Sequence, residues 1–194
     1  MAAIPAIMSD MAYTLREKST LYAGSRISLE LQRFEDELSG KIVKREVVIH
    51  LGSVVVLPFT TGGQQPTRND QILLIRNMRQ GLGKYLIELP AGTLEKGEAP
   101  INCAGRELQE ETGHLAQKLV PIGSFYASPG VLTEKLYAFA AYDLTQTVTH
   151  LDDGEEIEVL PVKYLDALEM IRTGEIEDAK TIATLLMYAL MFKH

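Results

Sequence analysis

The feature that most constrains this chain is a group of three carboxylates on one face of a helix predicted over residues 100–112. Glu107, Glu110 and Glu111 are spaced i, i+3 and i+4, so their side chains share that face. Like charges at this spacing repel each other, and two of them fall in the last turn, where the helix dipole disfavours anions. A divalent cation would remove this conflict, and oxygen-only donors favour Mg²⁺ or Mn²⁺ over Zn²⁺. For a bare E-x-x-E-E pattern, a solvated acidic helix face is the alternative interpretation.

The composition indicates a globular protein. A chain of 194 residues with 46% apolar residues fits one domain, or one domain with an appendage. The net charge of −7 argues against a general nucleic-acid binder or an anionic-membrane binder. Cys103 is the only cysteine, as is typical of a reducing compartment. We expect neither a signal peptide nor a transmembrane segment, and therefore a cytoplasmic protein.

The N-terminal part of the chain predicts a small β region. Residues 1–12 form a leader that we expect to be flexible, followed by a β region over 13–50 and a larger domain over 51–194. Within the β region, alternating apolar residues predict a strand over 21–34, and a turn separates it from a partner strand over 42–50. This hairpin contains few large apolar residues, so we expect it to pack on something else, with the second subunit of a dimer as one candidate.

The remainder of the chain predicts a mixed α/β fold. There are too few regular strand-helix-strand units for a doubly wound sheet. Pro100 in the first turn and Gly113 at the stop bound the predicted helix. The other predicted strands span 53–59, 71–79, 85–89, 120–126, 135–142 and 157–161, and two further helices span 164–173 and 179–192.

The segment that begins at Gly92 resembles the Nudix box. It matches the pattern G-x5-E-x7-R-E-U-x-E-E-x-G-U, where U is a bulky aliphatic residue, except that His114 replaces the last aliphatic residue. The resemblance implies a Nudix α/β/α sandwich with a mixed sheet. It also implies metal-dependent hydrolysis of a nucleoside diphosphate linked to another group.

The resemblance also implies roles for the box residues. Glu107 and Glu111 would bind metal, and Glu110 would be a ligand or lie just behind one. The carbonyl group of Ala91 would complete the metal shell, and Arg106 would orient the carboxylates. We expect two or more Mg²⁺ or Mn²⁺ ions.

Segments outside the box resemble those of ADP-ribose and nucleotide-sugar pyrophosphatases, in the same order from about residue 21 onward. The resemblance implies that Arg79, and with it Arg76, binds phosphate, since a guanidinium matches phosphate oxygens in pairs. It also implies that Arg45 lies near the nucleoside and that Glu134 contacts the distal sugar. Pro129, in the SPG turn, marks this subfamily. Without the resemblance, these would be surface residues and a loop proline.

A second acidic stretch, D-D-G-E-E over 152–156, precedes the strand at 157. By resemblance, Asp153 occupies the position of the general base and Glu155 that of a metal ligand. Aspartate is one methylene shorter than the usual glutamate, so Glu155 and Glu156 remain alternative bases.

The expected activity is hydrolysis of ADP-ribose or a related nucleoside diphosphate sugar to a nucleoside monophosphate and a sugar phosphate. The alternatives are a GDP-mannose hydrolase, a hydrolase of broad specificity, and a non-catalytic domain that senses nucleotide sugars. The resemblance also implies a homodimer.

Overall fold

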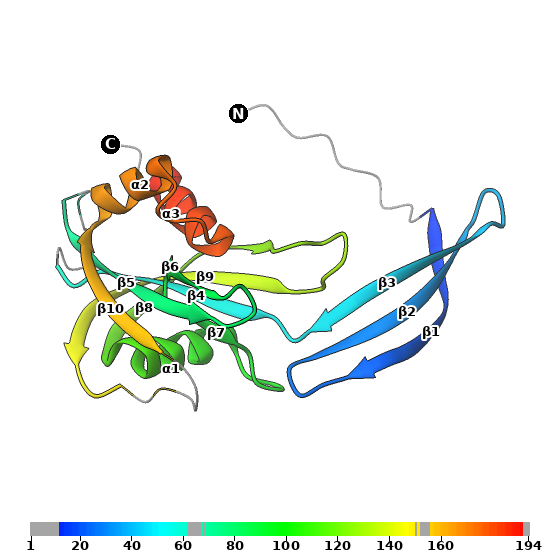
Figure 1. The fold of residues 1–194 in the computed structure, drawn as a ribbon, viewed down its shortest axis with the longest axis horizontal. Coiled ribbons are helices and arrows are strands. Elements are labelled where there is room, and N and C mark those ends of the chain that lie inside the picture. The colour runs from blue at the N-terminus through cyan, green and yellow to red at the C-terminus, as the bar shows by residue number, and fades with distance from the viewer. Residues whose placement is uncertain (1–11, 62–66, 68, 150, 152–155, 192–194) are drawn as a thin grey trace. The chain divides into compact units, whose positions relative to one another are not determined.

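A computed structural model describes residues 12–61, 67, 69–149, 151 and 156–191. Contacts between Cα atoms divide these residues into two compact units. The first contains the residues up to 50 together with 128–133, and the second contains the others. Figure 1 shows the strands and helices of each unit. The predicted leader, except for its last residue, lies outside the described residues.

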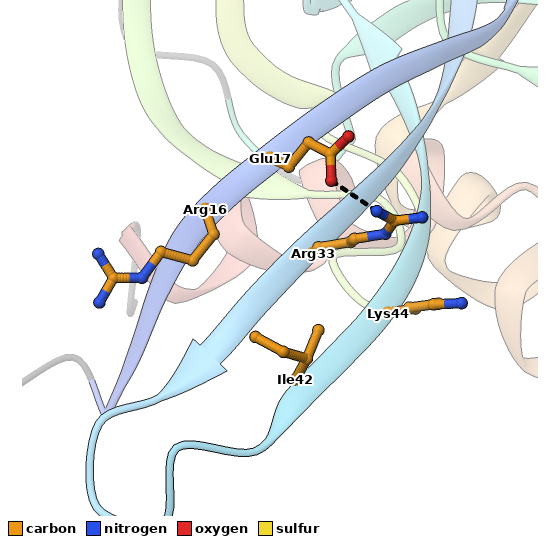
Figure 2. Close-up of a pocket in the computed structure, with 5 residues that line it drawn as sticks. All are labelled: Arg16, Glu17, Arg33, Ile42 and Lys44. Atoms are coloured by element: carbon orange, nitrogen blue, oxygen red, sulfur yellow. Dashed lines mark hydrogen bonds and ion pairs between the residues drawn. The ribbon is translucent and has the colours of Figure 1, made fainter.

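The first unit is built on a three-stranded antiparallel sheet in the order β1-β2-β3. Its strands are β1 (Tyr13–Ala23), β2 (Ile27–Asp36) and β3 (Ile42–His50), and none of their residues is buried. Charged side chains pair across neighbouring strands, as Arg33 and Glu17 do at 2.6 Å. Both residues line a pocket of about 380 Å³ together with Arg16, Ile42 and Lys44. Figure 2 shows these five side chains. A sheet without a buried face gains little from the hydrophobic effect by itself.

The segment 128–133 completes the first unit by pairing with β3. Val48 donates its N–H to the carbonyl of Val131 at 2.8 Å, and its own carbonyl accepts from Thr133 at 3.0 Å. Val48 also forms a parallel bridge with Leu132.

The second unit contains two sheets and three helices. One sheet has the order β7-β4-β9-β8, with β4 and β9 parallel, and the other has the order β10-β5-β6. Their strands are β4 (Ser53–Pro58), β5 (Gln71–Arg79), β6 (Lys84–Glu88), β7 (Ala91–Thr93), β8 (His114–Tyr126), β9 (Lys135–Gln146) and β10 (Ile157–Lys163). The helices are α1 (Pro100–Thr112), α2 (Tyr164–Thr173) and α3 (Ala179–Met191).

Strand β4 separates two apolar cores, because every residue from Ser53 to Pro58 is buried and alternate side chains point to opposite faces. Val54 and Val56 pack with the buried face of α1. Val55 and Leu57 pack with the buried residues of α2 and α3. Figure 1 shows α1 on one side of the strands and the other two helices on the opposite side. This confirms the predicted α/β/α sandwich with a mixed sheet.

Two differences from the predicted elements have clear physical reasons. The single strand predicted over 21–34 is wrong, because a tight turn over 24–26 divides it into β1 and β2. The turn closes with a hydrogen bond of 2.9 Å from the N–H of Gly24 to the carbonyl of Ile27. The strand predicted from residue 120 begins at His114 instead, since it pairs along β9 as far as Gln146. No helix among the described residues is long and apolar enough to cross a membrane.

Candidate active site

Helix α1 carries the acidic group, and its ends are fixed by local chemistry. Pro100 occupies its first turn, where a missing N–H costs nothing. Gly113 ends it in the left-handed conformation at φ 66°, donating its N–H to the carbonyl of Gln109. The helix has no basic residue in its last turn to offset Glu110 and Glu111. The unfavourable charge distribution predicted from the sequence is therefore present in the folded helix.

Arg106 lies at the centre of the acidic group and contacts three carboxylates. Its Nη1 donates to Glu107 at 2.7 Å and to Glu110 at 2.9 Å. Its Nε and Nη2 each donate to Glu98 at 3.1 Å. These bonds with Glu98 raise the pKa of Arg106 and, with the charge of Arg106, lower the pKa of Glu98. Glu98 also accepts from the N–H of Glu95 at 2.9 Å, so it closes the loop before α1.

Glu111 is the buried member of the acidic group, with only 4% of its surface exposed. Its carboxylate accepts a hydrogen bond of 2.8 Å from the N–H of Ala91. This bond brings the main chain of β7 to the side of α1 that carries the acidic residues.

Gly92 allows an equally close approach at the next residue. An ideal Cβ at this position would lie 1.9 Å from Cδ of Glu107 and 2.0 Å from its Oε1. Only glycine leaves room for that carboxylate, which gives the first glycine of the box a steric reason.

We call residues 88 to 92, with the sequence E-L-P-A-G, the 88–92 segment. Successive residues of this segment are each held by a specific contact. Leu89 donates its N–H to Oγ1 of Thr181 at 2.8 Å. The carbonyl of Pro90 accepts from the N–H of Val56 at 2.9 Å. Because Ala91 bonds Glu111 and Gly92 contacts Glu107, the segment is a rigid support for the acidic helix.

At the start of this segment, Glu88 pairs with two positively charged side chains, Arg79 and Lys180. Nε and Nη2 of Arg79 donate to its two oxygens at 2.7 and 2.5 Å, and Lys180 of α3 forms a further ion pair with it. Burial alone would raise the pKa of Glu88, but these hydrogen bonds and charges outweigh it and lower the pKa. Neither Glu88 nor Lys180 was predicted from the sequence. The available signal was a single carboxylate in the apolar run L-I-E-L, since a buried charge needs a partner.

Arg76 and Glu156 both contact the side chain of Tyr85. The guanidinium of Arg76 stacks 3.7 Å from the centre of the Tyr85 ring and lies 3.5 Å from Glu158. The Tyr85 hydroxyl donates to Glu156, and this bond raises the pKa of Tyr85. Glu156, one of the alternative bases, is therefore bound to a phenol. Asp153 and Glu155 lie outside the described residues.

Of the remaining predicted residues, one lies in the second unit and two lie in the first. Glu134 is half-buried in the second unit and accepts from Oγ of Ser53 at 2.6 Å. Arg45 is exposed on β3 of the first unit and donates to the carbonyl of Lys44 at 2.9 Å. Pro129 is exposed in the same unit.

The chemistry of the acidic group fits a hard divalent cation, since every side-chain donor is a carboxylate oxygen and Gly92 leaves Glu107 unobstructed. Among the described residues, however, no three His, Cys, Asp or Glu side chains are arranged to hold a metal. Glu107 and Glu110 turn toward Arg106, and Glu111 turns toward Ala91. Glu155, the other predicted ligand, lies outside the described residues.

The fold and the box define a Nudix hydrolase. The family model described as NUDIX domain matches residues 50–185, and the chain belongs to this family. It is 40% identical to the ADP-ribose pyrophosphatase of Bacillus subtilis (strain 168), over 84% of this chain and 85% of that protein. It is 32% identical to the GDP-mannose pyrophosphatase of Escherichia coli O9:H4 (strain HS), over 92% of this chain and 89% of that protein.

A solved structure described as an ADP compounds hydrolase has the same fold. It matches with a TM-score of 0.79 and 19% identity, over 95% of this chain and 96% of that chain. Together these matches confirm the prediction of a Nudix pyrophosphohydrolase related to enzymes that act on nucleoside diphosphate sugars.

Proposed function

We propose that this protein hydrolyses the diphosphate bond of ADP-ribose or a related nucleoside diphosphate sugar, releasing a nucleoside monophosphate and a sugar phosphate. The observation that carries the proposal is the arrangement of Glu98, Glu107 and Glu110 around Arg106, beside the buried Glu111. The relatives named as ADP-ribose and GDP-mannose pyrophosphatases support the substrate class.

We propose that Mg²⁺ or Mn²⁺ is the cofactor, as two or more ions. Glu107, Glu110 and Glu111 would hold them, with the carbonyl of Ala91 and with Glu155. When bound, such ions polarise phosphoryl oxygens and lower the pKa of water. Binding requires Glu107 and Glu110 to turn away from Arg106, which would still neutralise Glu98.

The chain's own residues then bind the diphosphate and move one proton. Arg79, and with it Arg76, binds phosphoryl oxygens. A carboxylate of the 153–156 loop takes the proton from water as its oxygen bonds to phosphorus, and the bridging P–O bond breaks so that the electron pair leaves with the departing phosphate. Asp153 is the first candidate for this base, with Glu155 and Glu156 as alternatives. One carboxylate oxygen of Glu156 accepts a hydrogen bond from the Tyr85 hydroxyl.

The substrate contacts proposed from the sequence include three further residues. Arg45 binds near the nucleoside, Glu134 near the distal sugar, and Pro129 shapes the turn that follows the box helix in sequence. The domain organisation proposed from the sequence assigns residues 13–50 to nucleoside and dimer contacts.

We also propose a homodimer formed through the first unit. Support comes from its sheet, which has no buried residue and exposes Tyr13, Leu15, Tyr22, Ile27 and Ile42. A fully active monomer at micromolar concentration, measured by light scattering, would contradict this.

The single cysteine, which is free and buried, suits the reducing conditions of a cytoplasm.

The experiment that tests the activity is a Mg²⁺-dependent screen of ADP-ribose, ADP-glucose, GDP-mannose and UDP-glucose that detects the released monophosphate. ADP-ribose should be hydrolysed with the highest kcat/KM. A preference for GDP-mannose would favour the second candidate, which the relative at 32% identity supports. Binding of ADP-ribose without metal-dependent turnover would favour a sensing domain, which we rank last because the box carboxylates are all present.

A further inference from the structure

The pair formed by Glu88 and Arg79 is arranged side-on. The carboxylate binds the edge of the guanidinium formed by Nε and Nη2. Among the described residues, Nη1 of Arg79 has no hydrogen-bond partner. The Arg79 side chain is 40% exposed, whereas that of Glu88 is 1% exposed. The Nε–Nη2 edge of the guanidinium is thus fixed by Glu88, and the Nη1 edge is open to a ligand.

Lys180 also binds Glu88, through Oε2, the oxygen that Nη2 of Arg79 contacts. It reaches Glu88 from α3, across 92 residues of sequence, and pairs with Asp178 at 3.0 Å. Asp178 accepts from the N–H and Oγ1 of Thr181 at 2.9 and 2.6 Å, as a helix N-cap does. Oγ1 of Thr181 also accepts the N–H of Leu89. The first turn of α3 therefore holds two residues at the start of the 88–92 segment, Glu88 and Leu89.

This arrangement is a poor device for stability alone. Burying an ion pair costs desolvation that its attraction barely offsets, and apolar residues of similar size commonly serve as well. It is a good device for orientation, because a carboxylate that Lys180 also binds leaves the guanidinium plane little freedom. The hydrogen bond with Glu88 is the main reason that the pKa of Arg79 is raised, and the negative charge of Glu111 adds to this effect.

We propose that Glu88 and Lys180 are positioning residues that fix the guanidinium of Arg79, so that its Nη1 edge meets a phosphoryl oxygen of the substrate. This rests on the proposed function, in which Arg79 binds the diphosphate. The anion that fits the open edge is a phosphoryl group of a nucleoside diphosphate, since two parallel N–H groups match its oxygens.

The test combines substitutions at these sites with matched surface controls. Glu88→Gln keeps the size of the side chain and removes its charge, and Lys180→Met keeps the stem and removes the ammonium. The controls are Glu177→Gln and Lys84→Met, which change a partly exposed ion pair of the same chemistry. Steady-state hydrolysis of ADP-ribose gives kcat and KM, and calorimetry gives the Kd of ADP, a plain diphosphate probe.

We expect Glu88→Gln and Lys180→Met to raise KM, and the Kd of ADP, by about tenfold, the effect of one lost charge-assisted hydrogen bond. kcat should change much less, and Lys180→Arg should restore most of the affinity. In an Arg79→Ala background, Glu88→Gln should add no more than about twofold, because a residue that acts through Arg79 has nothing left to position. The controls should leave both constants unchanged.

Equal effects of Glu88→Gln with and without Arg79 would overturn the inference, as would unchanged affinity in both single variants. If Glu88→Gln does not fold, Lys180→Met combined with Arg79→Ala provides the same comparison. An Arg79→Ala variant with unaltered affinity for ADP would refute the phosphate role of Arg79, and with it the inference. If the wild-type protein binds ADP but hydrolyses no nucleotide sugar, the proposed function fails while the ADP measurements still decide the positioning role.

Discussion

Gly92 and Glu107 are in such close contact that a Cβ on the glycine would lie 1.9 Å from Cδ of the glutamate. The main chain of β7 therefore runs directly against a carboxylate of the acidic helix. Two residues earlier the same chain is anchored to β4 through Pro90, and one residue earlier to Glu111. The conformation of the 88–92 segment and the positions of the carboxylates consequently depend on each other.

Gly92→Ala should displace Glu107 and reduce both stability and turnover. Neither the buried segment nor the helix can move far, so we expect a loss of about 1–3 kcal/mol in the free energy of unfolding. Urea denaturation and ADP-ribose hydrolysis would measure the two effects. Gly81→Ala is the control, because a Cβ there meets no atom within 4 Å. Wild-type turnover in Gly92→Ala would show that the close contact has no role in the site.

Arg106→Lys should impair the site although the charge is kept. A guanidinium can bind Glu98 through one edge and Glu107 and Glu110 through Nη1, whereas an ammonium has no planar fork. We expect kcat/KM to fall by about tenfold or more, the cost of one or two charge-assisted hydrogen bonds. The equivalent change Arg172→Lys, in an exposed pair with Glu169, should leave hydrolysis unchanged. Equal activity of the two variants would contradict the central position of Arg106.

The sequence was sufficient to predict the acidic helix, because its limits depend on local chemistry. Pro100 and Gly113 determine where α1 begins and ends, and the spacing of the glutamates determines their common face. The strand β5 was predicted with its observed ends for a similar reason, since four consecutive apolar residues, 72–75, lie in a segment with turn-rich sequences on both sides.

Elements fixed by distant partners could not be predicted. Strand β1 has the mostly polar sequence Y-T-L-R-E-K-S-T-L-Y-A with no buried residue, and pairing with β2 defines it. Strand β7 has three residues and exists through its pairing with β4. The ion pair between Glu88 and Lys180 joins residues far apart in sequence, so neither residue carries a local signal of its partner.

The stability of the protein should decrease in acid partly through Glu88. Its pKa is lowered in the folded protein, so between that value and the ordinary glutamate pKa of about 4.3 the unfolded chain binds more protons. The stabilisation is therefore complete above the ordinary pKa and is lost as the pH falls through the lower native value. Glu88→Gln should show a shallower acid decline of the free energy of unfolding in urea titrations. An unchanged decline would mean that the Glu88 charge does not stabilise the fold.

Cys103 should be unreactive in the native protein. It is fully buried in α1, and burial raises the pKa of its thiol to about 12, so the reactive thiolate is scarce at mildly alkaline pH. Iodoacetamide should modify it only after denaturation, as measured by mass spectrometry. Rapid alkylation of the native protein would indicate that the helix opens easily.

The most direct test of the central claim is hydrolysis of ADP-ribose by purified Glu111→Gln with saturating Mg²⁺. Glutamine keeps the size of this buried side chain and its ability to accept the bond from Ala91, but it removes the charge that a divalent ion requires. Wild-type protein should release the monophosphate only when Mg²⁺ or Mn²⁺ is present. The variant should lose at least about a thousandfold in kcat, a loss above the lower end of the roughly 10²–10⁴-fold effect of removing a general base. Near wild-type turnover by a folded Glu111→Gln would contradict the assignment of the acidic helix as the metal-binding catalytic element.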